Sequence, residues 1–244
     1  MIKINRASEL RKAIAPVLAI SKRVMIDVND NVLTSRFYDA ARIRYGEVSL
    51  HLSYSQFISD YDVPDCSFGL DLTELDKALK AFGVAEITVS RTKTGKYPCL
   101  RLSNNASMNV DIILDGMKED VKVFNCPVCP IEVDNLDSRK ILPMLKVCKS
   151  SVNKEFIKFI KKDESFKIAS IIAGDELVYE IALLDVKNDG FVSLPLGEVI
   201  DIFKNAAGAD IHMRYGTNAP AMFKWSYCGV YYTVIIAPRV ENED

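Results

Sequence analysis

The sequence predicts a duplicated α+β fold, in which two similar domains each pack two helices on antiparallel sheet. One helix and the strand after it occur twice, as LDLTELDKALKAFGVAEI from Leu70 and as LPLGEVIDIFKNAAGADI from Leu194, 124 residues apart. Most other segments alternate between apolar and polar residues, which is the period of a half-buried strand. Turn-forming clusters of Asn, Asp and Gly separate these segments.

The positions that match across the repeat are mainly those a core requires. They include Leu70 and Leu194, Leu72 and Leu196, Leu75 and Val199, Ala85 and Ala209, and Ile87 and Ile211. A second match aligns LRKAIAPVLAISK from Leu10 with SRKILPMLKVCKS from Ser138, at an offset of 128 that pairs Arg11 with Arg139. We attribute the difference of four residues between the two offsets to shorter loops in the second half.

The repeat also divides the chain. We expect an N-terminal domain over residues 1–114 and a C-terminal domain over residues 131–244. Between them, residues 115–130 read DGMKEDVKVFNCPVCP, which is charged at first and bounded by proline at its end, as in many linkers.

Four segments have the spacing of amphipathic helices. Their predicted inward positions are Leu10, Ala13, Ile14 and Val17; Leu72, Leu75, Leu79 and Phe82; Ile141, Leu142, Leu145 and Cys148; and Leu196, Val199, Ile200 and Phe203. Pro16 and Pro143 fall inside the first and third helices, where proline removes a hydrogen bond. A later start of the third helix would make Pro143 an acceptable first-turn residue.

Strands are predicted where the apolar period is two. The segments are VMIDV from Val24, EITVS from Glu86, CLRLS from Cys99, MNVDIIL from Met108, FKIAS from Phe166, ELVYEIAL from Glu176 and YYTVIIA from Tyr231. Each half therefore consists of a strand, a helix, several strands, a second helix and several more strands.

Basic residues lie on the outward side of all four predicted helices. They are Arg11, Lys12, Lys77, Lys80, Arg139, Lys146, Lys149 and Lys204. The segment from Ser138 to Ser150 has four basic residues and no acidic one. An ordinary solvated helix also carries lysines, so this pattern by itself leaves open whether the face binds anything.

Composition and charge limit the possible functions. With 49% hydrophobic and 26% charged residues, the chain is typical of a globular protein. No run approaches the roughly 18 apolar residues of a membrane span, and MIKINRASELRK lacks a signal-peptide core, so we expect an intracellular protein without membrane partners. The net charge of −2 argues against nucleic-acid binding over the whole surface, but allows binding through one basic face.

The CPVC segment at Cys126 to Cys129 suggests a different class of function. Two cysteines are half of a zinc site, and the only histidines, His51 and His212, lie far away in sequence. A redox pair would need a helix N-terminus, whereas the residues after Cys129 are typical of a strand. Phosphate-binding, dinucleotide-binding and hydrolase motifs are absent from the sequence, so we expect no catalytic residue, cofactor or metal.

Several segments together resemble the proliferating cell nuclear antigen, PCNA, the sliding clamp of archaea and eukaryotes. The C-terminal IIAPRVENED, YDAARI from Tyr38, GLDLTELDKALKAFG and GTNAPAMFKW from Gly216 resemble motifs of that family. Residues 115–130 fall where the family has its interdomain connecting loop. The resemblance covers the whole chain in order, and its specificity comes from the order and spacing of short motifs.

The resemblance implies a duplicated DNA-clamp fold, also called the processivity fold, and a ring of three subunits. The repeated helices would line the hole, so the eight basic residues named above would contact double-stranded DNA. Phosphate contacts carry no sequence information and therefore permit sliding. The implied function is to tether replicative polymerase and other replication and repair enzymes as a processivity factor, not as an enzyme. A checkpoint-type clamp paralogue in damage signalling is the alternative.

The resemblance also implies partners and two contact sites. DNA polymerase, clamp loader, nuclease and ligase would bind through short peptide motifs, at replicating DNA in an archaeal cell or a nucleus. The implied peptide pocket consists of Tyr38, Arg42, Val121, Val123, Pro220, Ile235, Ala237 and Pro238. In the ring, the strand Ser107 to Leu114 would pair with the strand Glu176 to Leu184 of the next subunit, removing both exposed edges.

Overall fold

The chain forms two compact units. The computed structural model describes residues 1–114, 121–122, 124–127, 129–152, 155–162, 165–172, 175–182, 189–206 and 208–239. Unit 1 comprises Met1–Arg42, Gly46–Val123 and Ser226–Tyr232, and unit 2 comprises Ile43–Tyr45, Phe124–Trp225 and Thr233–Asp244. No helix in the described ranges is long and apolar enough to span a membrane.

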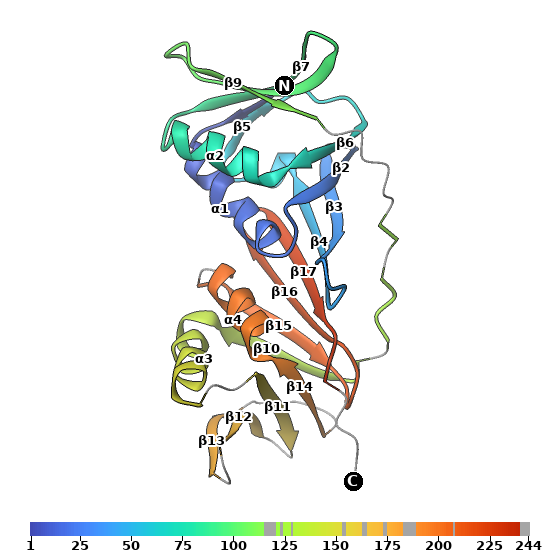
Figure 1. Cartoon of the computed structure of the whole chain (residues 1–244), viewed down its shortest axis with the longest axis vertical. Coiled ribbons are helices and arrows are strands. Elements are labelled where there is room, and N and C mark those ends of the chain that lie inside the picture. The colour runs from blue at the N-terminus through green and yellow to red at the C-terminus, as the bar shows by residue number, and fades with distance from the viewer. Residues whose placement is uncertain are drawn as a thin grey trace. The chain divides into compact units, whose positions relative to one another are not determined.

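Unit 1 contains two helices and two groups of antiparallel strands (Figure 1). In chain order its elements are β1 (Ile2–Ile4), α1 (Ala7–Leu18), β2 (Arg23–Asn29), β3 (Val32–Tyr38), β4 (Arg44–His51), the 3-10 helix η1 (Leu52–Tyr54), β5 (Ile58–Tyr61), β6 (Cys66–Asp71), α2 (Leu72–Phe82), β7 (Ile87–Thr94), β8 (Tyr97–Ser103) and β9 (Asn109–Ile113). Strand neighbours follow the order β5-β1-β7-β8-β9 in one group and β4-β3-β2-β6 in the other.

Unit 2 repeats this arrangement. Its elements are β10 (Ile131–Asp137), α3 (Ser138–Val152), β11 (Phe156–Lys162), β12 (Ser165–Ile172), β13 (Asp175–Ala182), β14 (Gly190–Pro195), α4 (Leu196–Asn205), β15 (Asp210–Tyr215), β16 (Ala221–Tyr227) and β17 (Val230–Ile236). The strand orders are β10-β15-β16-β17 and β13-β12-β11-β14. Three strands are divided between the units: β16 from Ser226 onward and β17 up to Tyr232 belong to unit 1, and β4 up to Tyr45 belongs to unit 2.

The pairing of strands confirms the predicted duplicated α+β fold. In each unit the first strand pairs with the strand after the second helix, as β1 does with β7 and β10 does with β15. The strand after the first helix pairs with the strand before the second, as β2 does with β6 and β11 does with β14. The second helices begin at Leu72 and Leu196, at the predicted offset of 124.

The predicted offset of 128 for the first helices is wrong by three residues. Helices α1 and α3 begin at Ala7 and Ser138, which are 131 residues apart. The strand register agrees, because Ile2 lies opposite Val89 and Val133 lies opposite Met213. Three residues are close to one helical turn, so the apolar stripes still overlap when the alignment is shifted by that amount.

The first helix also begins about one turn earlier than its apolar pattern suggested, at Ala7 and not near Leu10.

The hypothesis of a later start for the third helix is wrong, because α3 begins at Ser138 and holds Pro143 inside it. Pro143 is exposed, and so is Arg139, whose carbonyl lacks its usual donor. Water can therefore donate a hydrogen bond to the Arg139 carbonyl oxygen, and the packing of the core does not have to change.

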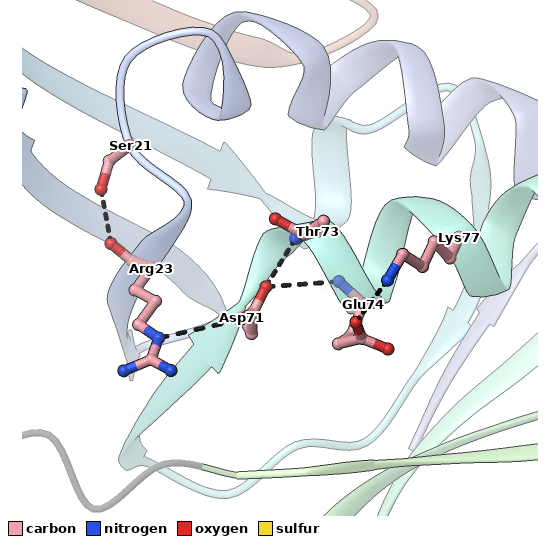
Figure 2. A network of polar contacts seen from close by, with 6 residues as sticks. All are labelled: Ser21, Arg23, Asp71, Thr73, Glu74 and Lys77. Carbon is pink, nitrogen blue, oxygen red and sulfur yellow. Dashed lines mark hydrogen bonds and ion pairs between the residues drawn. The ribbon is translucent and has the colours of Figure 1, made fainter.

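Helix α2 shows how local sequence positions these elements. It buries Leu72, Leu75, Leu79 and Phe82, the predicted inward positions. At its start the Asp71 carboxylate accepts hydrogen bonds from the backbone N–H groups of Thr73 at 2.8 Å and Glu74 at 3.3 Å (Figure 2). The Arg23 guanidinium lies 3.7 Å from the same carboxylate. The helix ends at Gly83, whose φ of 61° favours glycine.

Replacing Asp71 with alanine should destabilise unit 1 by about 1 kcal/mol, because two N–H groups lose their acceptor. The free energy of unfolding in urea measures this loss. Asp71→Asn is the matched control: it keeps the capping oxygen, removes only the exposed ion pair with Arg23, and should cost less. Equal losses in the two variants would contradict the capping role.

Candidate nucleic-acid interface

Helices α1 and α2 of unit 1 lie side by side, with their predicted basic residues at the surface (Figure 1). Arg11 of α1 pairs with Asp76 of α2, with 2.7 Å between Nε and Oδ1. On the same helices Lys12 pairs with Glu9 at 3.0 Å, and Lys77 pairs with Glu74 at 2.8 Å. Lys80 is exposed and has no ion pair within the described residues.

These ion pairs make the helical surface of unit 1 only weakly positive. Across α1 and α2 there are four basic and three acidic residues. Hydrogen bonds from the Tyr227 hydroxyl and from Lys12 lower the pKa of Glu9, which favours its ionised form. A hydrogen bond to Glu74 and charge attraction to it raise the pKa of Lys77, which favours its charged form.

Helix α3 of unit 2 is the most basic element of the two helix pairs. It carries four basic residues and no acidic one. The Arg139 guanidinium pairs with Asp137 at 3.0 Å, just before the helix. Lys146 and Lys149 are exposed and have no ion pair to any described residue.

Lys140 is a further exposed basic residue of α3 that was not among the predicted contact residues. Its position next to Arg139 in an acid-free helix was the signal that could have identified it. The structure places it at the exposed surface of α3. Helix α4 adds the exposed Lys204, although it also holds two acidic residues, Glu198 and Asp201.

Exposed ammonium groups without acidic partners suit phosphate contacts. A lysine already paired with a carboxylate must lose that pairing, at least in part, when it binds phosphate. An unpaired lysine exchanges only its hydration and counterions. By this criterion Lys80, Lys146, Lys149 and Lys204 are the strongest candidates among the predicted residues. Their contact with DNA stays a prediction.

Strands β9 and β13 each offer an edge for pairing with another chain. Among the described strands, β9 lies at one end of its sheet with β5 at the other end, and β13 lies at one end of its sheet with β14 at the other end. Ile113 of β9 is 60% exposed, which is unusual for an isoleucine in a sheet. β9 is held to β8 by a bidentate ion pair, in which Arg101 Nε and Nη2 each lie 2.7 Å from an Asp111 oxygen. Thr94 donates a further hydrogen bond to Asp111 at 2.7 Å.

The predicted peptide-pocket residues are divided between the units, so their grouping stays a prediction. In unit 1, Tyr38 is half-buried and Arg42 is exposed, with a φ of 56°. Val121 is half-buried, and Val123 lies outside the described residues. In unit 2, Pro220 and Pro238 are half-buried and Ala237 is exposed, whereas Ile235 is 4% exposed and packs in the core.

The CPVC cysteines lie close together in unit 2. The two sulfur atoms of Cys126 and Cys129 are 3.7 Å apart, and the Cys129 thiol donates toward the Pro220 carbonyl oxygen at 3.3 Å. Burial and the contact with Cys126 raise the pKa of Cys129 to about 12, which opposes thiolate chemistry. His212 pairs with Asp134. Within the described ranges, no group of three or more His, Cys, Asp or Glu could hold a metal ion.

The pKa of Asp111 provides a test of the β8–β9 connection. Hydrogen bonds from Arg101 and Thr94 lower this pKa to about 2. The contribution of the ion pair should therefore be present above about pH 4 and be lost as the pH falls towards 2. In Arg101→Gln, carboxyl-carbon NMR should show the Asp111 pKa rising towards its ordinary value of 3.8. An unchanged pKa in that variant would contradict the pairing.

Comparison with solved structures supplies the wider context. PCNA from A. fulgidus, solved with the C-terminal region of FEN-1 bound, superposes with a TM-score of 0.84 and 16% identity over 100% of both chains. PCNA from Entamoeba histolytica superposes with a TM-score of 0.82 and 15% identity over 98% of both chains. PCNA from Thermococcus kodakaraensis superposes with a TM-score of 0.80 and 18% identity, over 98% of this chain and 100% of that PCNA chain.

The similarity is much stronger in three dimensions than in sequence identity. No family model and no curated protein matches the sequence. A TM-score of at least 0.80 over nearly all of both chains nevertheless requires the same elements in the same order and spatial arrangement. The two units of this chain, each with two helices on antiparallel strands, therefore have the fold of the PCNA sliding clamps.

Proposed function

We propose that this protein is a sliding clamp: three copies close into a ring around duplex DNA and tether replication and repair proteins to it. The observation that carries this proposal is the match of the whole chain to PCNA structures, with TM-scores from 0.80 to 0.84. The acid-free helix α3 and the unpaired edges of β9 and β13 support it independently.

The charge distribution suits a ring that must move along DNA. Base-specific contacts would create a barrier at each site, whereas lysine–phosphate contacts are similar at every base pair. The net charge of −2 means that the positive helices are balanced by acidic residues elsewhere, which limits adhesion of the rest of the surface to DNA. Residence on DNA would come from closure of the ring, so affinity need not be high.

The two units would contribute unequally to DNA contact. In α1 and α2 most basic side chains already have acidic partners, whereas the cations of α3 after Arg139 have none within the described residues. We therefore expect α3 to supply the larger share of the phosphate contacts. Around the hole of the ring, weakly positive regions formed by α1 and α2 would therefore alternate with strongly positive regions formed by α3.

Ring closure would join β9 of one copy to β13 of the next. Among the described strands, β9 and β13 each have a neighbour on one side only, and pairing them would satisfy the backbone groups of both. The exposed Ile113 would then lose its contact with water. The same interface occurring three times, head to tail, closes a ring that leaves neither a β9 nor a β13 edge free.

Partner proteins would bind by short peptides, as in the structure of PCNA from A. fulgidus with the C-terminal region of FEN-1. The pocket we propose comprises Tyr38, Arg42, Val121, Val123, Pro220, Ile235, Ala237 and Pro238. The role of the protein would be to bind and hold other enzymes, and no catalytic step is assigned to it.

Solution mass tests the ring. The wild-type chain should have a mass near three times 27.3 kDa by sedimentation or light scattering. Ile113→Lys places a charge in the proposed contact and should shift the mass towards that of one chain. Val84→Lys is the matched control, because Val84 is 77% exposed and lies outside β9. A wild-type monomer at high concentration, or a trimer in Ile113→Lys, would contradict this interface.

Salt-dependent DNA binding tests the helices. Lys146→Gln with Lys149→Gln should weaken binding to duplex DNA at low salt more than Lys80→Gln with Lys204→Gln. Each lost phosphate contact should reduce the slope of log affinity against log salt by about 0.9. Fluorescence anisotropy measures both quantities.

The matched controls for these variants are pairs of exposed lysines on strands and turns, Lys93 with Lys96 and Lys162 with Lys224. Replacing them with glutamine changes the net charge equally and should leave the slope nearly unchanged. If the control pairs reduce binding as much as the α3 pair, only the overall charge matters and the assignment of the helical surface is wrong.

A further inference from the structure

A partly open cavity of about 150 Å³ lies in unit 1. Residues of α1, α2 and both groups of strands line it together with Val230 of β17, and every lining side chain except Thr34 and Ser35 is apolar. It is separate from the exposed basic residues of α1 and α2 and from the β9 edge. Protein cores seldom contain empty spaces of this size, so the cavity requires an explanation.

The packing of β2 shows that the space arises from missing contacts. Val24 and Val28 are 2% and 4% exposed. Ile26 lies between them on the same face of the strand, yet it is only half-buried. Ile26 lines the cavity, so its unpacked surface faces this space. Leu33 of β3 is also half-buried and lines the cavity, whereas Phe37 on the same strand is 4% exposed.

Unit 2 shows what fills the corresponding space. Ile26 lies opposite Phe68, and Phe159 lies opposite Val192, which is 124 residues after Phe68. By the register of the strands, Ile26 therefore corresponds to Phe159. In the same way Val28 corresponds to Lys161, and their partners on the next strands are Leu33 and Phe166.

Aromatic rings thus occupy in unit 2 the positions that aliphatic side chains occupy in unit 1. The rings of Phe159 and Phe166 stack with 6.0 Å between their centroids, and both residues are fully buried. At one position the larger side chain is in unit 1, where Phe68 corresponds to Val192 of unit 2. Phe68 does not fill the cavity, since it lines the space and is itself half-buried.

One buried polar side chain lies beside the cavity. Ser35 is 4% exposed and belongs to the lining, and within the described residues its Oγ has no hydrogen-bond partner. The Oγ atom itself is covered by protein, so neither water nor a ligand in the cavity contacts it. A water molecule would need two to four polar partners to be stable, and the apolar lining does not offer them. An apolar molecule without a hydrogen-bonding group suits this lining.

We propose that this cavity is a binding site for a small apolar ring compound of about the size of benzene. A dry protein cavity of about 150 Å³ lined by Leu, Ile and Phe is large enough to bind benzene. The ligand would replace the two phenylalanine rings that unit 2 supplies from its own sequence. A charged ligand is excluded, because no charged side chain lines the space.

Benzene is the probe that tests this site, and phenol is its polar comparison. Benzene should raise the melting temperature of the wild-type protein and shift the methyl NMR signals of Leu33 and Val48. Phenol should bind more weakly than benzene, because the apolar lining offers its hydroxyl no accessible partner.

Leu33→Phe tests whether binding takes place in the cavity. This change places in unit 1 the residue that unit 2 has at the corresponding position, and it should abolish benzene binding. Val84→Phe adds the same ring at an exposed position and should leave binding unchanged. If Leu33→Phe does not fold, Ile26→Phe, which copies Phe159 of unit 2, decides in the same way. Absence of benzene binding to wild type, benzene binding to the folded phenylalanine variant, or tighter binding of phenol than of benzene would overturn the proposal.

Discussion

The burial of one apolar stripe on each of four helices is the constraint on which the rest of the structure depends. In α2 that stripe consists of fully enclosed leucines and a phenylalanine, and α4 repeats it with Val199 and Phe203. A helix that buries one side on a sheet must present the other side to solvent. The positions available for charge are therefore set by the packing of the core, and the basic surfaces follow from it.

Duplication of the fold did not produce two identical units. Unit 1 neutralises most of its helical cations through ion pairs such as Arg11 with Asp76, whereas α3 of unit 2 has no acidic residue. The interiors differ as well, since stacked phenylalanines fill unit 2 where unit 1 retains a cavity. Each difference arises from a few side chains on a shared backbone topology, which is how a repeated fold can acquire separate tasks.

The residues of the predicted linker, 115–130, that the structure describes in unit 2 make weak contacts with the rest of that unit. The Phe124 ring lies 5.9 Å from the Tyr45 ring, and the Cys129 thiol approaches the Pro220 carbonyl. The raised pKa of Cys129 keeps it as a neutral thiol, which contributes packing and weak hydrogen bonds.

The sequence by itself determined the α+β class, the duplication and the bounds of α2, because apolar period and turn residues act over a few residues. It left the first helix pair misaligned by three residues, since a shift of nearly one turn preserves an apolar stripe. Only tertiary structure decided that Arg11 meets Asp76, 65 positions further along the chain, and that Ile26 faces empty space. Such contacts depend on which elements pack together, and local patterns do not encode that choice.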